Sequence, residues 1–159
     1  LGAAVVRPHI AEFFERQYLP LGCPYTGHPL ACAAAVAAIS EYRDRDLPAR
    51  AAKMGGYLMA GLRTLQESHP LVGDVRGLGL LACLELVKDR TTREPLVPWN
   101  SSDPLPARIK RRLLDRGLFA YVRWNAIFLS PPLIISEAEI DEGLAVLDDV
   151  LGEVEAGKV

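Results

Sequence analysis

Two short segments carry side chains whose types and spacing suit chemistry. The first is residues 23–29, Cys-Pro-Tyr-Thr-Gly-His-Pro, where the hydroxyl of Thr26 and the imidazole of His28 lead into the start of an alanine-rich helix. The free N–H groups and the dipole of a helix N-terminus attract an anion such as phosphate. An ordinary helix start explains the same residues, so the spacing leaves both interpretations open.

The second segment places Arg123 beside Trp124, between short predicted strands at residues 118–122 and 126–129. A guanidinium at such a junction can bind a carboxylate or a sulfonate through two parallel hydrogen bonds. The alternative role is a surface salt bridge with an acidic side chain. Considered by itself, the segment does not decide between the two roles.

The lysines lack the surroundings that covalent catalysis needs. A lysine that forms a Schiff base sits in a partly buried pocket, which lowers its pKa. Two of the four lysines fall opposite the apolar stripes of predicted helices, one begins a charged turn and one lies near the end of the chain. They are Lys53, Lys110, Lys88 and Lys158. We therefore assign none of them a catalytic role.

Histidine and cysteine are too scattered for a metal site. The three histidines lie far apart in sequence, and the three cysteines contain no C-x-x-C pair. This pattern fits neither a zinc site nor a disulfide framework, so we expect packing thiols and no metal. The chain also has no glycine-rich nucleotide loop and no nucleophile elbow.

Composition narrows the class of protein. The 159 residues are 50% hydrophobic and 24% charged, with 18 Lys plus Arg against 20 Asp plus Glu. These values are typical of one soluble domain, and the near balance of charge argues against nucleic-acid binding. There is no signal-peptide pattern and no run of about 18 apolar residues that could span a membrane, so we expect a cytoplasmic location. The first residue is Leu1 rather than Met, which suggests part of a longer protein.

The first 45 residues are predicted to end a parallel α/β sheet. Residues 1–7 form an apolar run before Pro8, which predicts a strand followed by a helix over residues 8–16. A loop rich in Pro and Gly then leads to a helix over residues 29–44. Six alanines leave little side-chain bulk on this helix, so we expect another segment to pack close to its backbone.

Residues 46–159 are predicted to form a compact α+β unit, with three helices on one face of a small, mostly antiparallel sheet. Helices are expected over residues 46–66 and 105–116 and after residue 136, where Ser136 and Glu139 form a capping box. The segment 71–87 predicts two strands joined by a glycine turn. The two short strands beside Arg123 complete the predicted sheet.

Three segments in order resemble the class III aminotransferases, the ω-amino acid type of the fold type I pyridoxal-phosphate enzymes. They are residues 20–35, Pro-Leu-Gly-Cys-Pro-Tyr-Thr-Gly-His-Pro-Leu-Ala-Cys-Ala-Ala-Ala; residues 73–79, Gly-Asp-Val-Arg-Gly-Leu-Gly, with Glu-Leu-Val at 85–87; and residues 129–137, Leu-Ser-Pro-Pro-Leu-Ile-Ile-Ser-Glu. Residues 93–98 and 122–125 are most similar to the subgroup that pairs taurine or ω-amino acids with pyruvate.

The resemblance implies a homodimer with active sites at the subunit interface and pyridoxal 5'-phosphate as cofactor. Residues 1–45 would be the tail of the large cofactor-binding domain, and residues 46–159 would be the small C-terminal domain. The loop at residues 23–29 would reach the cofactor phosphate of the other subunit. Pro24 stands where the family has its phosphate-binding threonine and offers neither a hydroxyl nor an N–H. The phosphate contact is therefore assigned to Thr26, and the acidic end of the substrate to Arg123.

The resemblance also implies transfer of an amino group from an ω-amino acid or amine to an oxo acid such as pyruvate. The Schiff-base lysine of the family would lie upstream of residue 1, so we expect this chain to be a fragment that is inactive alone. Two alternatives stay open. One is a self-contained, non-catalytic α+β module for binding or interaction, and the other is a related enzyme that acts as a racemase or aminomutase.

Overall fold

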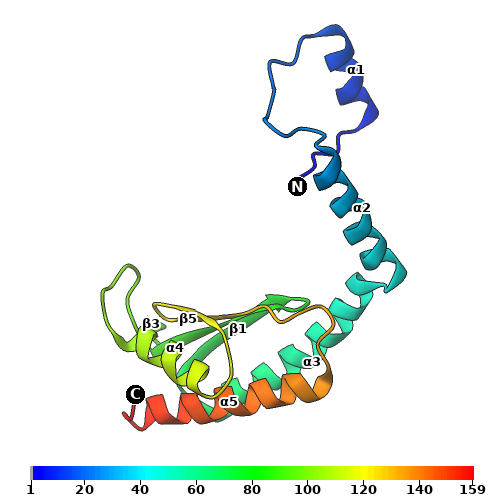
Figure 1. Cartoon of the computed structure of the whole chain (residues 1–159). Coiled ribbons are helices and arrows are strands. Elements are labelled where there is room, and N and C mark those ends of the chain that lie inside the picture. The colour runs from blue at the N-terminus through cyan, green and yellow to red at the C-terminus, as the bar shows by residue number, and fades with distance from the viewer. Residues whose placement is uncertain (1) are drawn as a thin grey trace. The chain divides into compact units, whose positions relative to one another are not determined.

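The computed structural model describes residues 2–159 and divides them into two compact units, the first ending at Asp46 and the second spanning Leu47–Val159. Figure 1 labels the elements of both units. The helices are α1 (Pro8–Arg16), α2 (Pro29–Asp44), α3 (Leu47–Ser68), α4 (Leu105–Asp115) and α5 (Glu137–Glu155). The strands are β1 (Val72–Leu78), β2 (Leu81–Asp89), β3 (Glu94–Pro95), β4 (Tyr121–Arg123) and β5 (Ala126–Leu129).

The first unit consists of α1, α2 and the loop between them. The strand predicted over residues 1–7 is wrong for residues 2–7, which have no regular structure, while residue 1 lies outside the described part. The reason is that a strand needs a neighbour for its hydrogen bonds, and residues 2–46 contain no second strand. The helix prediction for residues 8–16 is confirmed.

Helix α2 begins where the sequence predicts. His28 is its N-cap, with a side chain that accepts a hydrogen bond from the Ala31 N–H, and Pro29 follows in the first turn. No residue of α2 is buried. The close neighbour expected for its alanines is therefore not found within this unit.

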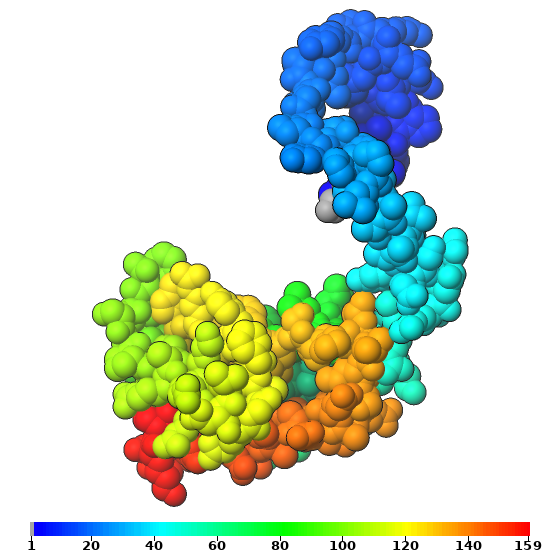
Figure 2. Space-filling model, viewed as in Figure 1, coloured from blue at the N-terminus to red at the C-terminus, as the bar shows by residue number. Residues whose placement is uncertain are grey.

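The second unit is a five-stranded sheet packed against helices, and its predicted antiparallel character is confirmed. The order is β1-β2-β5-β4, with β3 paired to the other part of β2, and every pair is antiparallel. Figure 1 shows α3 and α5 side by side below the sheet, in agreement with their packing in one core. In Figure 2 the atoms of this unit, from cyan to red, pack into one body.

Buried apolar side chains from α3, α4, α5 and the strands form one core. The side chains with almost no exposure include Leu62, Leu84, Leu86, Ile109, Leu113, Ile127, Leu147 and Leu151. Leu84 and Leu86 lie two residues apart on β2, so both point to the same face, where the helices pack. This arrangement confirms the predicted layer of three helices on one face of the sheet.

The turn between β1 and β2 packs directly on the backbone of α3. A Cβ atom added at Gly55 would lie 2.2 Å from the carbonyl oxygen of Gly79, which itself has φ +55°. Glycine at Gly55 permits this approach, and glycine at Gly79 permits the left-handed turn. The glycines of α3 weaken the isolated helix, but Gly55 is needed for its packing.

Helix α5 is fixed to the rest of the unit at both ends. The predicted capping box is confirmed: the Ser136 side chain accepts from the Glu139 N–H, and the Glu139 carboxylate accepts from the Ser136 N–H. Near the other end, the His69 ring lies between Asp148 and Glu155, with nitrogen–oxygen distances of 2.7 and 2.9 Å. His69 directly follows α3, so this contact joins the ends of α3 and α5.

Candidate functional site

Arg123 ends β4, immediately before the turn Trp124-Asn125 that leads to β5. Its side chain is exposed, and the Cζ atom lies 4.2 Å from the centroid of the Trp124 ring. The Nη1 group donates a hydrogen bond of 3.3 Å to the Tyr121 hydroxyl. The short hairpin predicted around Arg123 is confirmed, and it places an aromatic ring against the guanidinium.

No carboxylate within residues 2–159 pairs with Arg123. Glu85, on β2, is already engaged, since one of its oxygens accepts from Asn125 at 3.1 Å and the other from Arg76 at 2.6 Å. The Arg123 guanidinium therefore keeps N–H groups for an anion from solution. Of the two roles left open by the sequence, a salt bridge between Arg123 and an acidic side chain is not found within residues 2–159.

A polar network on the sheet anchors the turn beside Arg123. Arg76 binds both Glu85 and Asp74, and the hydrogen bonds that its guanidinium donates to these carboxylates raise the pKa of Arg76, which stays charged. Glu85 in turn holds the Asn125 amide, and the Asn125 carbonyl accepts a hydrogen bond from the Leu86 N–H at 2.6 Å. The sequence contained a signal for this network, because Asp74 and Arg76 lie two residues apart on one strand and share a face.

Thr26 lies in a tight turn ahead of α2. Its hydroxyl donates to the Cys23 carbonyl at 2.6 Å, and its N–H donates to the same oxygen at 3.2 Å. Tyr25 and Gly27 on either side have φ +65° and +68°. The Thr26 side chain is exposed, and the lone pairs of its oxygen are available to a donor. The Nδ1 atom of His28 caps α2 by accepting from the Ala31 N–H, so the other ring nitrogen, Nε2, is the one that can donate to an anion. The Thr26 hydroxyl can donate to an anion only after it turns away from the Cys23 carbonyl.

Thr26 and Arg123 belong to different units, each of which the structure describes by itself. All four lysines of the chain are exposed. Lys88 pairs with Glu94 at 2.6 Å, and the ammonium of Lys110 lies 5.9 Å from the centroid of the Phe119 ring. None of them has the buried surroundings that lower the pKa of a Schiff-base lysine.

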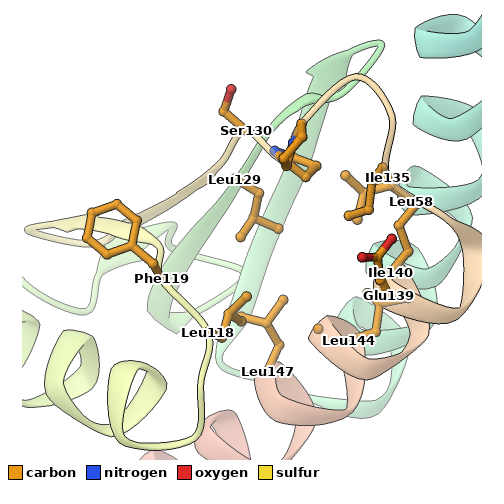
Figure 3. A pocket seen from close by; sticks show the side chains of 13 residues that line it. Leu58, Leu118, Phe119, Leu129, Ser130, Ile135, Glu139, Ile140, Leu144 and Leu147 are labelled. Atoms are coloured by element: carbon orange, nitrogen blue, oxygen red, sulfur yellow. The ribbon is translucent and has the colours of Figure 1, made fainter.

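An apolar cavity of about 360 Å³ lies between α3, α5 and the segment that follows β5. Figure 3 shows leucine and isoleucine side chains around it, with the Ser130 hydroxyl turned outward. The Glu139 carboxylate at its edge is bound in the capping box of α5, and this bond lowers the pKa of Glu139. The cavity therefore offers no free acid or base, and we assign it no catalytic role.

Comparison with known proteins identifies the family of the chain. The profile of the family described as "Aminotransferase class-III" matches residues 1–151. The chain is 39% identical over 143 residues to the leucine/methionine racemase of Thermococcus litoralis, covering 88% of this chain and 31% of the relative. It is 36% identical over 134 residues to the 5-aminovalerate aminotransferase DavT of Pseudomonas aeruginosa, covering 84% of this chain and 31% of the relative.

Solved structures show the same fold. The taurine:2-oxoglutarate aminotransferase of Bifidobacterium kashiwanohense, in complex with PLP and glutamate, superposes with a TM-score of 0.89 at 36% identity. The match covers 96% of this chain and 34% of that structure. The chain thus spans about a third of the length of the proteins that it resembles.

No helix in the described residues 2–159 is long and apolar enough to cross a membrane.

Proposed function

Because the chain belongs to the class III aminotransferase family, we propose that it is part of an enzyme that uses pyridoxal 5'-phosphate to transfer an amino group. The donor is an ω-amino acid or amine, and the acceptor is an oxo acid such as pyruvate. The names of the aminovalerate and taurine relatives support an ω-amino donor. The single observation that carries the proposal is Arg123, an exposed guanidinium without a carboxylate partner in the described residues.

The two units correspond to two proposed domains. Residues 1–45 belong to the large cofactor-binding domain, and residues 46–159 form the small domain. The division of the structure after Asp46 supports this assignment, as does the single core of the second unit. We also propose that the parent enzyme is a homodimer in which the loop at residues 23–29 contacts the partner's cofactor. The expected cytoplasmic location stays a prediction.

The residues present fit one end of the cofactor. Thr26 offers an exposed hydroxyl, which can donate to a phosphate oxygen once it rotates away from the Cys23 carbonyl. The neighbouring Pro24 can donate nothing. When bound, pyridoxal phosphate supplies an electron sink that stabilises negative charge on the carbon next to the amine. No lysine of this chain suits the aldehyde end, so we propose that the lysine comes from upstream sequence.

Arg123 has a separate task in this proposal. Its guanidinium binds the carboxylate or sulfonate at one end of the substrate, which orients the amino group at the other end. A charge-assisted hydrogen bond contributes about 1.5–3 kcal/mol. Loss of this interaction corresponds to a decrease of about 10- to 150-fold in kcat/KM for an acidic substrate.

The test compares Arg123→Ala with the wild type in the full-length parent enzyme. We expect KM to rise strongly for ω-amino acids and oxo acids and to change little for a plain amine donor. Arg111→Ala is the matched control, because Arg111 is an exposed arginine of α4 that pairs with Asp115. Equal effects of Arg123→Ala on acidic and plain substrates would remove Arg123 from the substrate site.

A second experiment tests the position of the lysine. The 159-residue chain alone, mixed with pyridoxal phosphate, should show no absorbance band of a lysine-bound cofactor and no amino transfer. Either signal would show that the chain contains its own reactive lysine. If the gene upstream of Leu1 encodes no lysine that can bind the cofactor, the alternative of a non-catalytic binding module replaces this proposal.

Racemisation is a second candidate function, favoured by the 39% identity to a leucine/methionine racemase. A racemase inverts its amino acid without an acceptor, whereas a transaminase needs an oxo acid to complete its cycle. Product analysis of the parent enzyme with and without the oxo acid separates the two. Chiral inversion in the absence of the acceptor would replace transfer by racemisation.

A further inference from the structure

Trp124 has a backbone conformation that its residue type disfavours. Its φ is +51°, and it occupies the first position of the two-residue turn between Arg123 and Ala126, which pair across β4 and β5. Gly, Asn and Asp are the usual residues at positive φ in such hairpin turns, because a larger side chain crowds the backbone. A tryptophan in this place is strained, and such strain is retained where the surrounding structure requires the side chain.

Core packing does not account for the strain. Trp124 is only half-buried and lies outside the hydrophobic core of the second unit. Its ring instead contacts two other side chains. The Arg123 guanidinium lies 4.2 Å from the ring centroid, and the Trp99 ring lies 5.4 Å away with a tilt of 46°. Trp99 comes from the loop that follows β3 and is 76% exposed.

The geometry leaves the hydrogen-bonding edge of Arg123 available. Stacking on an aromatic ring uses the flat face of a guanidinium, whereas binding of a carboxylate uses its N–H edge. One N–H of Arg123 donates to the Tyr121 hydroxyl, and the other groups have no carboxylate partner in the described chain. The backbone of the turn that carries Trp124 is held in place as well, because Asn125 is bound to β2 through Glu85 and Leu86.

We propose that Trp124 is a positioning residue for Arg123 and that Trp99 supports the Trp124 ring. The three side chains contact one another in series, with the Trp99 ring tilted against that of Trp124. In this proposal the group, named here the Arg-Trp-Trp stack, fixes the guanidinium before an acidic substrate arrives. A free arginine loses much rotamer freedom when it binds a ligand, and a preformed stack reduces this loss. The proposal rests on the proposed role of Arg123 in binding the acidic end of the substrate.

The experiment uses the full-length holoenzyme and three variants at one position. Trp124→Gly removes the ring and suits the positive φ, Trp124→Asn also suits the φ and removes the ring, and Trp124→Phe keeps an aromatic face. A cation–π contact at an exposed site corresponds to an effect of about 2- to 5-fold. We expect Gly and Asn to raise KM for an acidic substrate by this factor, with kcat and the KM of a plain amine almost unchanged. Phe should retain most of the wild-type KM.

Thermal unfolding of the same variants separates positioning from general stability. Because Gly relieves the backbone strain, Trp124→Gly should not lower Tm even though it raises KM for the acid. A merely structural tryptophan would lower Tm and weaken the binding of both substrates together. That pattern, or an unchanged KM for the acid in Trp124→Gly, would overturn the proposed stack.

Wild type, Trp124→Gly, Arg123→Ala and the double variant Arg123→Ala/Trp124→Gly together form a double-mutant cycle. If the stack is correct, removal of the Trp124 ring has no further effect on KM once Arg123 is absent. If Arg123→Ala is selective for acids and Trp124→Gly is not, the stack is wrong and the proposed function of Arg123 stands. If Arg123→Ala shows no selectivity, the proposed function of Arg123 is wrong and the stack proposal is refuted with it.

Discussion

His69 should make the second unit less stable as the pH rises above about 6.5. Its two ring nitrogens face Asp148 and Glu155, and a carboxylate can only accept, so both nitrogens carry protons in this arrangement. Burial by itself lowers the pKa of His69, but the hydrogen bonds to Glu155 and Asp148 outweigh burial and raise the pKa above its usual 6.5. A positive charge also lies near His69, because the Arg90 guanidinium donates a hydrogen bond to the His69 carbonyl.

The sign follows from proton linkage. Between the unfolded and the folded pKa, the folded state binds more protons, so the free energy of unfolding falls as pH rises, by at most about 1.4 kcal/mol per pH unit. The stabilisation is complete below pH 6.5 and is lost as the pH passes the folded pKa. His69→Gln removes the titration. The bond to the partly buried Glu155 contributes about 1.5–3 kcal/mol and the one to the exposed Asp148 at most about 1 kcal/mol.

The amide of glutamine regains about 1 kcal/mol of this, so His69→Gln should destabilise the protein by roughly 0.5–3 kcal/mol at pH 5.5. The loss should shrink toward pH 8.5. Urea unfolding followed by tryptophan fluorescence reports on this unit, because both tryptophans, Trp99 and Trp124, lie in it. His9→Gln, at an exposed position of α1, is the control. If the free energy of unfolding changes with pH equally in wild type and His69→Gln, the protonated His69 between Asp148 and Glu155 is refuted.

Three smaller changes test the packing of α3 and the start of α5. Gly55→Ala should destabilise by about 1–3 kcal/mol, because its Cβ would meet the Gly79 carbonyl at 2.2 Å. Gly56→Ala, with nothing within 4 Å, should stabilise by up to about 1 kcal/mol in the same urea assay, and equal effects at both sites would contradict the close approach. Ser136→Ala should cost about 1 kcal/mol while Ser136→Thr retains the cap, and no loss in the alanine variant would show that the capping box with Glu139 contributes little.

The second unit was predictable because its local signals agree with its packing. The capping box at Ser136 and the glycine at Gly117 mark the start of α5 and the end of α4, and the structure confirms both helices. The structure of the loop after β2 was harder to predict. Its Pro and Ser residues are typical of an irregular surface segment, but Glu94–Pro95 forms β3, and Val97, two residues later, is fully buried. The local sequence of this loop gives no sign of β3, because this strand forms only through its pairing with β2.

The strand predicted over residues 1–7 failed for a different reason. An apolar run with β-branched residues states only that a segment suits a sheet, and the ladder itself needs a partner strand. Residues 2–46 provide no partner, so residues 2–7 have no regular structure here. The exposed apolar side chains of this unit, such as Phe13, Val36 and Ile39, fit the proposal that it belongs to a larger domain.

The candidate site shows where a sequence alone becomes ambiguous. The residue type of Arg123 and its place between strands single it out in the sequence, but they do not show which carboxylates lie near it. Glu85 lies close in the sheet and is occupied by Arg76 and Asn125, a fact that depends on the register of three strands. The contact with Trp99 was equally hidden, because Trp99 lies 24 positions before Arg123 in the sequence. The positive φ of Trp124 joins these observations. A strained turn, an arginine without a carboxylate partner in residues 2–159 and a second tryptophan occur at one place, and the proposed role of Trp124 in holding the guanidinium accounts for all three.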